Sequence, residues 1–369
     1  MNNSNNKVWG VTCLFNPFRS SARYLNYMYF QNRIRRQGLK LVTVEMALKE
    51  QEYELVNRDS DILIQIKNDN KLWQKESLLN LGFQKIPDSA EVVCWIDADI
   101  ILFDKHWVNN LLDKIRKYPV VHLFRSMVYL PQPVSKQIVG DFKIDDAPKF
   151  KIRYGNSITE VDKLSLKPIL GSVAIFYETQ KGKFINGKWG FGWAIRKNIL
   201  DQVGGLYDRC IVGGGDTIFF NSVFWNTLHE KFKSRYTPAH QTDIQDYIQQ
   251  LHSFINGRVG YLSGKMGHLW HGSFKSRNYF DRYQLLQRGH FHPRFDLSRD
   301  RGCLRWNHRY FRTMLSDDEK SHKDNMIKNV EDYLASFRKN MVNTGYNLFN
   351  PFDGIKVPAQ LENEINMKN

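Results

Sequence analysis

The amino-acid sequence predicts an α/β fold in which helices cover a largely parallel sheet. Strand-like and helix-like segments alternate through the first half of the chain, and this alternation is typical of parallel strands joined by helical crossovers. The most apolar stretch, residues 92–103, is interrupted only by Asp97 and Asp99. A hydrophobic content of 42% with 14% aromatic residues is sufficient for a buried core, which excludes a wholly disordered chain.

The elements of the first half follow from local patterns. Residues 8–15 form an apolar, β-branched run that ends at Asn16-Pro17, which indicates a buried strand followed by a loop. A helix follows, with apolar side chains at helical spacing, and Gly38 ends it. The further elements expected here are strands over 39–46, 61–66 and 92–103 and a helix over 71–83.

The second half is less regular. Residues 124–167 have weak periodicity, and we expect an insertion or lid at about 125–168. Beyond it we expect a strand over 169–177, a turn at 189–192, a helix over 194–203 that Gly204-Gly205 caps, and a helix from Asp216 to about 228. The organisation predicted is a disordered tail over 1–7, one α/β domain over 8–312 and a helical C-terminal extension over 313–369, with its clearest helix at 326–337.

The charge and the cysteines limit the class of protein. The net charge is +15, and between Arg258 and Arg312 twelve Lys and Arg residues face only three acids. Such an excess fits nucleic acid, an anionic membrane surface, phosphate-bearing ligands or simply a solvated basic face. The four cysteines are far apart and form no CxxC pair, which is typical of free thiols in a reducing compartment. With no signal peptide and no apolar membrane span in the sequence, we expect a cytoplasmic protein.

Asp97 and Asp99 are the first candidates for a functional site. A bare carboxylate in an apolar strand is unfavourable by several kcal/mol, so each requires a cationic partner. Because residues at i and i+2 of an extended segment face the same side, the pair could share one Mg²⁺ or Mn²⁺ ion that bridges a diphosphate. A pair of strand-end carboxylates that cap a helix or meet an arginine explains the pattern equally well.

Several short motifs in order resemble the β-1,4-galactosyltransferase family and the related chondroitin-type N-acetylgalactosaminyltransferases. Asn16-Pro17-Phe18-Arg19 is similar to the Pro-Phe-Arg signature of the family. It is followed by the acidic pair and then by segments similar to a Gly-Phe-Gly turn, an Asn-Gly-Phe segment and a Gly-Gly-Glu-Asp run. These three segments are Trp189-Gly190-Phe191-Gly192-Trp193, Val203-Gly204-Gly205-Leu206-Tyr207-Asp208 and Gly213-Gly214-Gly215-Asp216.

This resemblance implies a GT-A fold, a Rossmann-like mixed sheet that binds a nucleotide-sugar, with UDP as the nucleotide and Mn²⁺ or Mg²⁺ under the diphosphate. It also implies an inverting transfer of a hexose to a saccharide or glycolipid hydroxyl. Carried over by position, Asp97 and Asp99 are metal ligands, Asp216 is the catalytic base and Arg19 lies near the nucleotide. Gly215 departs from the family, which has at this position an acidic residue that binds the acceptor. The identity of the acceptor is therefore open.

Further residues are candidates with an alternative beside each. Asp216 follows glycines at the start of a helix, where a carboxylate is also a good N-cap. His268 or His271 could complete the metal shell as a neutral imidazole, although a structural role for either is as reasonable. The remaining candidates for the donor or acceptor site are Asn16, Glu45, Lys75, Trp189, Gly190 and Gly192, with Trp73 and Trp193 as packing or stacking residues.

Three other functions fit parts of the sequence. The basic C-terminal third, rich in aromatic residues, allows a transferase that acts on modified nucleic acid, a nucleic-acid-binding module on a degenerate α/β scaffold, or peripheral contact with a membrane. A nucleotidyltransferase also uses paired aspartates and Mg²⁺. It usually has a glycine-rich loop after its first strand, whereas residues 16–21 contain no glycine.

Overall fold

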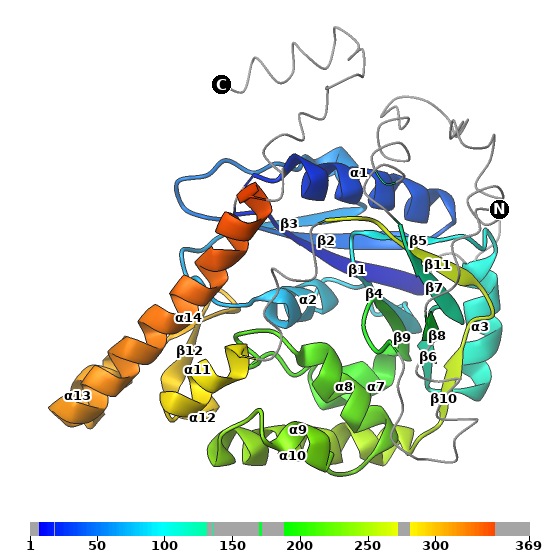
Figure 1. Cartoon of the computed structure of the whole chain (residues 1–369). Helices are drawn as coiled ribbons and strands as arrows, with labels where there is room; N and C mark the ends of the chain where they lie inside the picture. Colours follow the sequence, from blue (N-terminus) through cyan, green and yellow to red (C-terminus); the bar gives the residue numbers. More distant parts are fainter. Residues whose placement is uncertain are drawn as a thin grey trace, which may run out of the picture.

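A seven-stranded mixed sheet forms the centre of the molecule (Figure 1). The computed structural model describes residues 7–17, 19–130, 135, 170–171, 188–271 and 281–343, and all structural statements concern these residues. In spatial order the strands are β10 (Val259–Tyr261), β6 (Val120–His122), β9 (Gly192–Arg196), β4 (Val92–Ile96), β1 (Val8–Phe15), β2 (Lys40–Ala47) and β3 (Ile62–Lys67).

The predicted parallel arrangement is confirmed for four neighbouring strands. β1 runs parallel to both β2 and β4, and β2 runs parallel to β3. β9, in contrast, is inserted antiparallel between β4 and β6, and this strand makes the sheet mixed. The mixed α/β class with flanking helices is therefore the one observed.

Helices cover both faces of this sheet, and β4 shows how its sequence divides between them. Val92, Cys94 and Ile96 pack in one cluster, and Val93 and Trp95 pack in the other, as the two-residue repeat of a strand requires. The first cluster includes side chains of α1 (Ser21–Arg36) and α3 (Trp107–Lys117). The second includes side chains of α2 (Lys75–Phe83), α7 (Lys197–Val203), α8 (Gly215–Phe224) and α10 (Pro238–Ile255).

A second sheet continues from the carboxyl end of β4. It contains, in order, β5 (Ile100–Leu102), β11 (Lys265–His268), β7 (Ser126–Tyr129) and β8 (Leu170–Gly171). The single strand predicted over 92–103 is therefore two strands in different sheets, with Asp97 and Asp99 in the connection. Just before the chain leaves the central sheet, the backbone N–H of Asp97 donates to the carbonyl of Phe191, 2.8 Å away, in the turn before β9.

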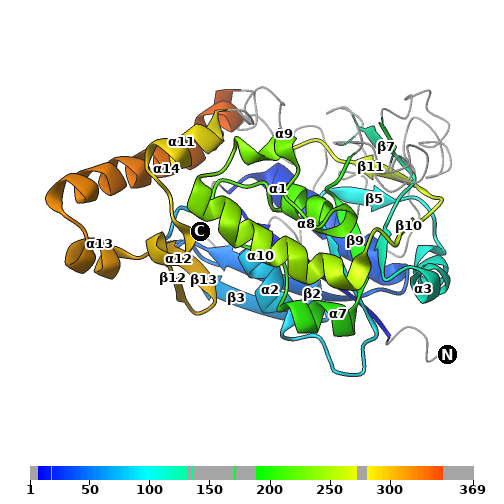
Figure 2. The same cartoon turned by 90° about the horizontal axis from the view of Figure 1, so that it is seen from below.

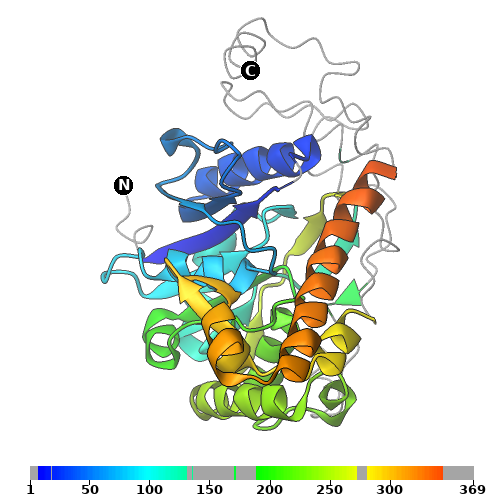
Figure 3. The ribbon, with the colours of Figure 1, turned by 90° about the vertical axis from the view of Figure 1, so that its left-hand side faces the viewer.

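The C-terminal part packs beside the α2 and α10 side of the molecule (Figures 2 and 3). The ammonium of Lys323, in the long helix that ends the described chain, lies 2.7 Å from the carboxylate of Asp296. The predicted helix over 326–337 is confirmed and is longer than predicted, while the predicted boundary at 312/313 lies inside another helix. The elements here are α9 (Glu230–Lys233), α11 (Arg282–Arg288), α12 (Pro293–Asp296), a hairpin of β12 (Leu297–Asp300) and β13 (Cys303–Trp306), α13 (His308–Met314) and α14 (Asp317–Asn343).

Other predictions of secondary structure need correction. The helix expected over 194–203 is wrong in its first part, because Ala194 and Ile195 are fully buried in β9 between β4 and β6. The helix begins only at Lys197, and it ends as predicted at Gly204, whose φ of 78° is the left-handed cap. The helix that contains Asp216 stops at Phe224 and not near 228. Of the strand predicted over 169–177, the structure describes only Leu170–Gly171, which form β8. Most of the insertion lies outside the described residues.

Two further findings concern the cysteines and the membrane. All four cysteines are free thiols. Among the helices of the described residues, none is both long and apolar enough to cross a bilayer.

Candidate active site

Three potential metal ligands meet where β5 pairs with β11. The Nε2 atom of His271 lies 3.2 Å from Oδ2 of Asp99, and Nε2 of His268 lies 3.8 Å from Oδ1 of the same carboxylate. One ligand atom from each of the three residues lies within 4.8 Å of the other two. One carboxylate and two imidazoles at this spacing are a suitable ligand set for a divalent transition metal. Both histidines singled out from the sequence therefore belong to one group with Asp99.

Strand pairing brings these residues together from distant parts of the chain. β11 is antiparallel to β5 with His268 opposite Ile100, and the N–H of Leu269 donates to the carbonyl of Asp99 at 2.7 Å. The aromatic rings of Tyr129 and Phe191 lie edge-on to the His268 imidazole, each with its centroid 5.2 Å away. His268 is thus fixed by a strand and its neighbours, which favours a preformed site.

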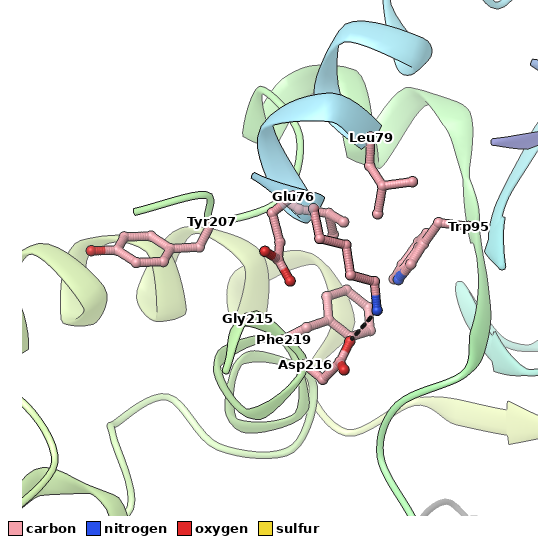
Figure 4. A pocket seen from close by; sticks show the side chains of 9 residues that line it. Glu76, Leu79, Trp95, Tyr207, Gly215, Asp216 and Phe219 are labelled. Carbon is pink, nitrogen blue, oxygen red and sulfur yellow. Dashed lines mark ion pairs between the residues drawn. The ribbon is translucent and has the colours of Figure 1, made fainter. Parts of the chain in front are cut away.

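Asp97 takes a different partner from Asp99. Its Oδ1 atom lies 2.7 Å from the ammonium of Lys75, and the same ammonium lies 3.5 Å from Oδ1 of Asp216 (Figure 4). Lys75 is the first residue of α2, and Asp216 is the second residue of α8. The end of β4 and the starts of two helices therefore converge on one buried lysine. The structure places Asp97 in this acid–lysine cluster and outside the three-residue group around Asp99.

Electrostatics in the acid–lysine cluster keep the lysine charged. Although burial lowers the pKa of Lys75, the carboxylates of Asp216, Asp97 and Glu76 raise it well above its usual value. Burial raises the pKa of Asp97 and of Asp216, and the ammonium of Lys75 opposes this rise in both. Asp99 also raises the pKa of Asp97, so the two clusters are close enough to interact.

The glycine-rich turn before β9 lies against Asp216. A Cβ atom on Gly190 would come within 3.0 Å of Oδ2 of Asp216, so the missing side chain leaves room for the carboxylate. The next residue, Phe191, has a φ of 80° and accepts the hydrogen bond from Asp97. Gly192 is the first residue of β9 and is buried against Leu123. The predicted turn therefore contacts both aspartates of the acid–lysine cluster.

The N-cap alternative for Asp216 is not what the structure shows. Gly214 occupies the N-cap position of α8 with a φ of 110° and no side-chain hydrogen bond. The carboxylate of Asp216 is paired with Lys75 instead of capping the helix.

The other predicted donor residues have internal partners. Glu45 is 2% exposed, and its oxygens accept hydrogen bonds from the backbone N–H groups of Glu54 and Leu55 and from Nε2 of Gln65. Glu45 is therefore not a surface carboxylate. These bonds fix the loop between β2 and β3.

The loop after β1 is held in a similar way. The amide of Asn16 donates to the carbonyl of Ser20 and to the carboxylate of Glu54, at 3.0 and 3.2 Å. The guanidinium of Arg19 donates to the carbonyl of Glu52. Phe18, part of the Pro-Phe-Arg motif, lies outside the described residues.

The tryptophans around the glycine-rich turn differ in exposure. Trp193 is 1% exposed and stacks on His122, with the ring centroids 4.0 Å apart, so it cannot form a platform for a sugar. Trp189 is partly buried and stacks on Phe220 of α8, with the centroids 5.1 Å apart. Trp73, also partly buried, places its ring beside the backbone of Gly213.

Sequence reasoning missed two buried charged residues near this site. Glu76 is 4% exposed and lines a cavity with Lys75, Gly215 and Asp216 (Figure 4). Arg282 is 8% exposed, and Nη1 of its guanidinium lies 3.0 Å from where a Cβ on Gly213 would be. No local signal in the sequence identifies Glu76, because its contact with Gly215 exists only in the folded chain. Nothing in the local sequence separates Arg282 from the other basic residues around it.

Comparison with known proteins finds likeness in structure alone. No protein-family model matches the chain, and no curated protein matches its sequence. Among solved structures, residues 1–349 of TarS from S. aureus are 13% identical with a TM-score of 0.38, over 96% of this chain and 77% of that chain.

Two other matches come from different organisms. The catalytic domain of Drosophila β1,4-galactosyltransferase 7 in complex with xylobiose is 11% identical with a TM-score of 0.29, over 72% of this chain and 71% of that chain. Glucosyl-3-phosphoglycerate synthase from Mycobacterium tuberculosis with Mn²⁺, UDP and glucosyl-3-phosphoglycerate is 8% identical with a TM-score of 0.37, over 76% and 78%. These matches include the class of enzyme that the sequence motifs resemble.

Proposed function

We propose that this protein is a metal-dependent glycosyltransferase that moves a sugar from a UDP-sugar to a hydroxyl group of a saccharide or glycolipid. One observation carries the proposal. Three residues that could hold a metal ion lie beside the Lys75–Asp216 ion pair at the carboxyl end of β4. They are Asp99, His268 and His271. In α/β sheets this end of the strands is where ligands bind. The order of the sequence motifs gives the donor class.

The ligand set favours Mn²⁺ over Mg²⁺. Carboxylate oxygens suit both ions, whereas imidazole nitrogen suits the transition metals. Asp99, His268 and His271 would hold the ion, and Asp97 would keep Lys75 in place beside it. When bound, the ion supplies positive charge that stabilises the diphosphate as it leaves the sugar.

Asp216 is the residue that we propose as the base. In an inverting transfer the acceptor oxygen forms a bond to the anomeric carbon while the bond from that carbon to the diphosphate breaks, and the hydroxyl proton passes to the base. Asp216 is about a third exposed and lies against the Gly190 backbone, so an acceptor can reach it. Burial raises the pKa of Asp216, which strengthens the carboxylate as a base, and the ammonium of Lys75 opposes the rise.

The basic C-terminal third supports a nucleic-acid acceptor less well than its charge in the sequence suggests. Arg294 is ion-paired with both Asp243 and Asp246, and Arg299 is ion-paired with Asp208. Part of the positive charge in the sequence is therefore neutralised within the fold. We place the enzyme in the cytoplasm, since its four free cysteines fit a reducing compartment.

The first experiment measures donor binding. UDP with Mn²⁺ should raise the melting temperature of the wild-type protein, because a ligand at 100 times its Kd stabilises the folded state by about 2.7 kcal/mol. The variants Asp99→Asn, His268→Ala and His271→Ala should lose the Mn²⁺-dependent part of this shift, as should wild-type protein treated with EDTA.

The matched control is Asp113→Asn. Asp113 is exposed on α3 and pairs with Arg116, three residues along the helix, so this variant should keep the full shift. Absence of any shift with UDP-, GDP- and dTDP-sugars in the presence of Mn²⁺, Mg²⁺ or Zn²⁺ would rule the proposal out.

A further inference from the structure

Glu76 is a buried carboxylate without a full set of partners. It lies in the first turn of α2 and is 4% exposed, and its Oε2 atom has no hydrogen-bond partner among the described residues. Buried polar atoms are nearly always paired, because an unpaired one is unfavourable by about 1–3 kcal/mol, and more when charged. An unpaired oxygen next to a proposed base therefore requires an explanation.

Gly215 provides the space that this carboxylate fills. A Cβ atom on Gly215 would lie 2.3 Å from Oε1, 2.5 Å from Cδ and 2.7 Å from Cγ of Glu76. The backbone does not require glycine there, since Gly215 is not among the residues with positive φ. The absence of a side chain at 215 is thus explained by the carboxylate of Glu76. Figure 4 shows this carboxylate directed toward Gly215, next to Asp216.

The two carboxylates line one small cavity at different depths. Its volume is about 10 Å³, close to what a single water molecule or hydroxyl group needs. The side chain of Asp216 is 35% exposed, whereas Glu76 is buried. Apolar side chains close the rest of the cavity, which is lined by Leu79, Trp95, Leu206, Tyr207 and Phe219. A ligand that reaches Asp216 can therefore insert one further hydroxyl toward Glu76.

We propose that Glu76 determines acceptor specificity by accepting a hydrogen bond from a second hydroxyl of the acceptor sugar. That hydroxyl is adjacent to the one that Asp216 deprotonates. The inference rests on the proposed function and deepens it. It assigns to the acceptor a pair of neighbouring free hydroxyls. It also places the binding carboxylate on α2, against Gly215 of α8, which has no side chain.

The first test compares two buried glutamates in the absence of any ligand. Glu76→Gln keeps the shape of the side chain and removes the charge, so it should leave the free energy of unfolding unchanged or raise it. Glu45→Gln is the matched control, because Glu45 is equally buried but has three hydrogen-bond donors, and it should lower the free energy of unfolding. Denaturant titration of both variants decides between the roles. An equal loss of stability in both would make Glu76 structural and overturn the inference.

The second test measures transfer. The probes are UDP-glucose, UDP-galactose, UDP-N-acetylglucosamine and UDP-N-acetylgalactosamine with Mn²⁺, and the acceptors are the methyl β-glycosides of glucose, galactose, N-acetylglucosamine and xylose. Glu76→Gln should raise the acceptor KM by about tenfold or more, the effect of losing one buried hydrogen bond to a charged group. The donor KM and the hydrolysis of the donor by water should stay within twofold of wild type.

A swap of the carboxylate between the two elements isolates its role. Gly215→Ala should be destabilised by the clash with Glu76, and Glu76→Ala in the same chain should relieve it. The double variant Glu76→Ala/Gly215→Glu returns a carboxylate to the same volume from α8, and it should recover transfer that Glu76→Ala loses.

The outcomes separate the inference from the function beneath it. Wild-type acceptor KM in Glu76→Gln, with donor binding intact, overturns the inference alone. Absence of a UDP and Mn²⁺ shift in the wild-type protein overturns the proposed function. If donor binds but none of the four glycosides accepts sugar, the stability comparison of Glu76→Gln with Glu45→Gln decides.

Discussion

Asp97 and Asp99 are two residues apart in the sequence and lie in different electrostatic environments. Asp97 is 2.7 Å from the ammonium of Lys75 and therefore has a cation supplied by the chain itself. Asp99 instead lies beside the imidazoles of His268 and His271. Its Oδ2 atom is 3.2 Å from Nε2 of His271. The connection between β4 and β5 therefore has two parts. Lys75 neutralises the charge of Asp97, which we call the neutralised side, whereas Asp99 with its two histidines is suited to an external cation.

This difference shows why a pair of acids in a sequence does not identify its ligands. An extended segment would direct both carboxylates to one face, as the i, i+2 pattern implies. The chain instead turns between β4 and β5, and each acid takes the partners that the neighbouring elements supply. β11 supplies histidines to Asp99, and α2 supplies a lysine to Asp97.

If Asp99 binds the metal and Asp216 acts as the base, metal binding and catalysis should be lost in different variants. Asp216→Asn removes the proposed base but none of the three residues around Asp99, so transfer should fall by about 10²–10⁴-fold. The Mn²⁺-dependent rise in melting temperature should persist in this variant, whereas Asp99→Asn should lose both. Transfer is followed as UDP released, and the control is Asp201→Asn, an exposed aspartate that pairs with Lys197 on α7. Loss of the Mn²⁺ shift in Asp216→Asn would show that the two clusters are one site.

How much of this arrangement is predictable from the sequence depends on the kind of signal. The strands β1, β2 and β3 and the helix α2 have strong local periodicity, and they were predicted to within a few residues. The helix α3 and the strand β6 were not predicted. Ala194 and Ile195 were assigned to a helix because an antiparallel insertion between β4 and β6 has no local signature, and burial on both faces looks alike in either element.

The candidate site follows the same rule. Asp97, Asp99, His268, His271 and Asp216 were found by residue type and order along the chain. The partition of these residues into two clusters was not, because it depends on strand pairing over more than 160 residues. Glu76 was missed since its environment comes from a glycine 139 positions away, which only the folded chain places against it.

Removing Lys75 tests the neutralised side. Lys75→Met leaves Asp97 and Asp216 without their shared cation, and breaking a fully buried pair lowers stability by about 3–5 kcal/mol. Because Asp216 is a third exposed, we expect a smaller loss of about 2–3 kcal/mol at pH 7. The loss should shrink as the pH falls and the carboxyls become protonated. Denaturant titrations at pH 5 and pH 7 measure it, with Lys75→Arg as the variant that keeps the charge. A loss independent of pH would point to packing and not to charge.

Glu76 also makes the stability of the protein depend on pH. Burial raises the pKa of this carboxyl from 4.5 to about 7, with Lys75 opposing the rise and Asp216 and Asp208 adding to it. Between these two pH values the folded protein holds a proton that the unfolded chain has lost, so this group makes the protein less stable as the pH rises from about 4.5 to 7. Glu76→Gln has no proton to lose, and its stability relative to wild type should therefore increase across that range by roughly 3 kcal/mol and stay nearly constant above it. Lys75, Asp208 and Asp216 are common to both proteins, so the difference between the two curves isolates Glu76. A difference in stability that does not change with pH would mean that the carboxyl of Glu76 is already ionised at pH 5. Glu76 would then have a cationic partner, as Asp97 has in Lys75.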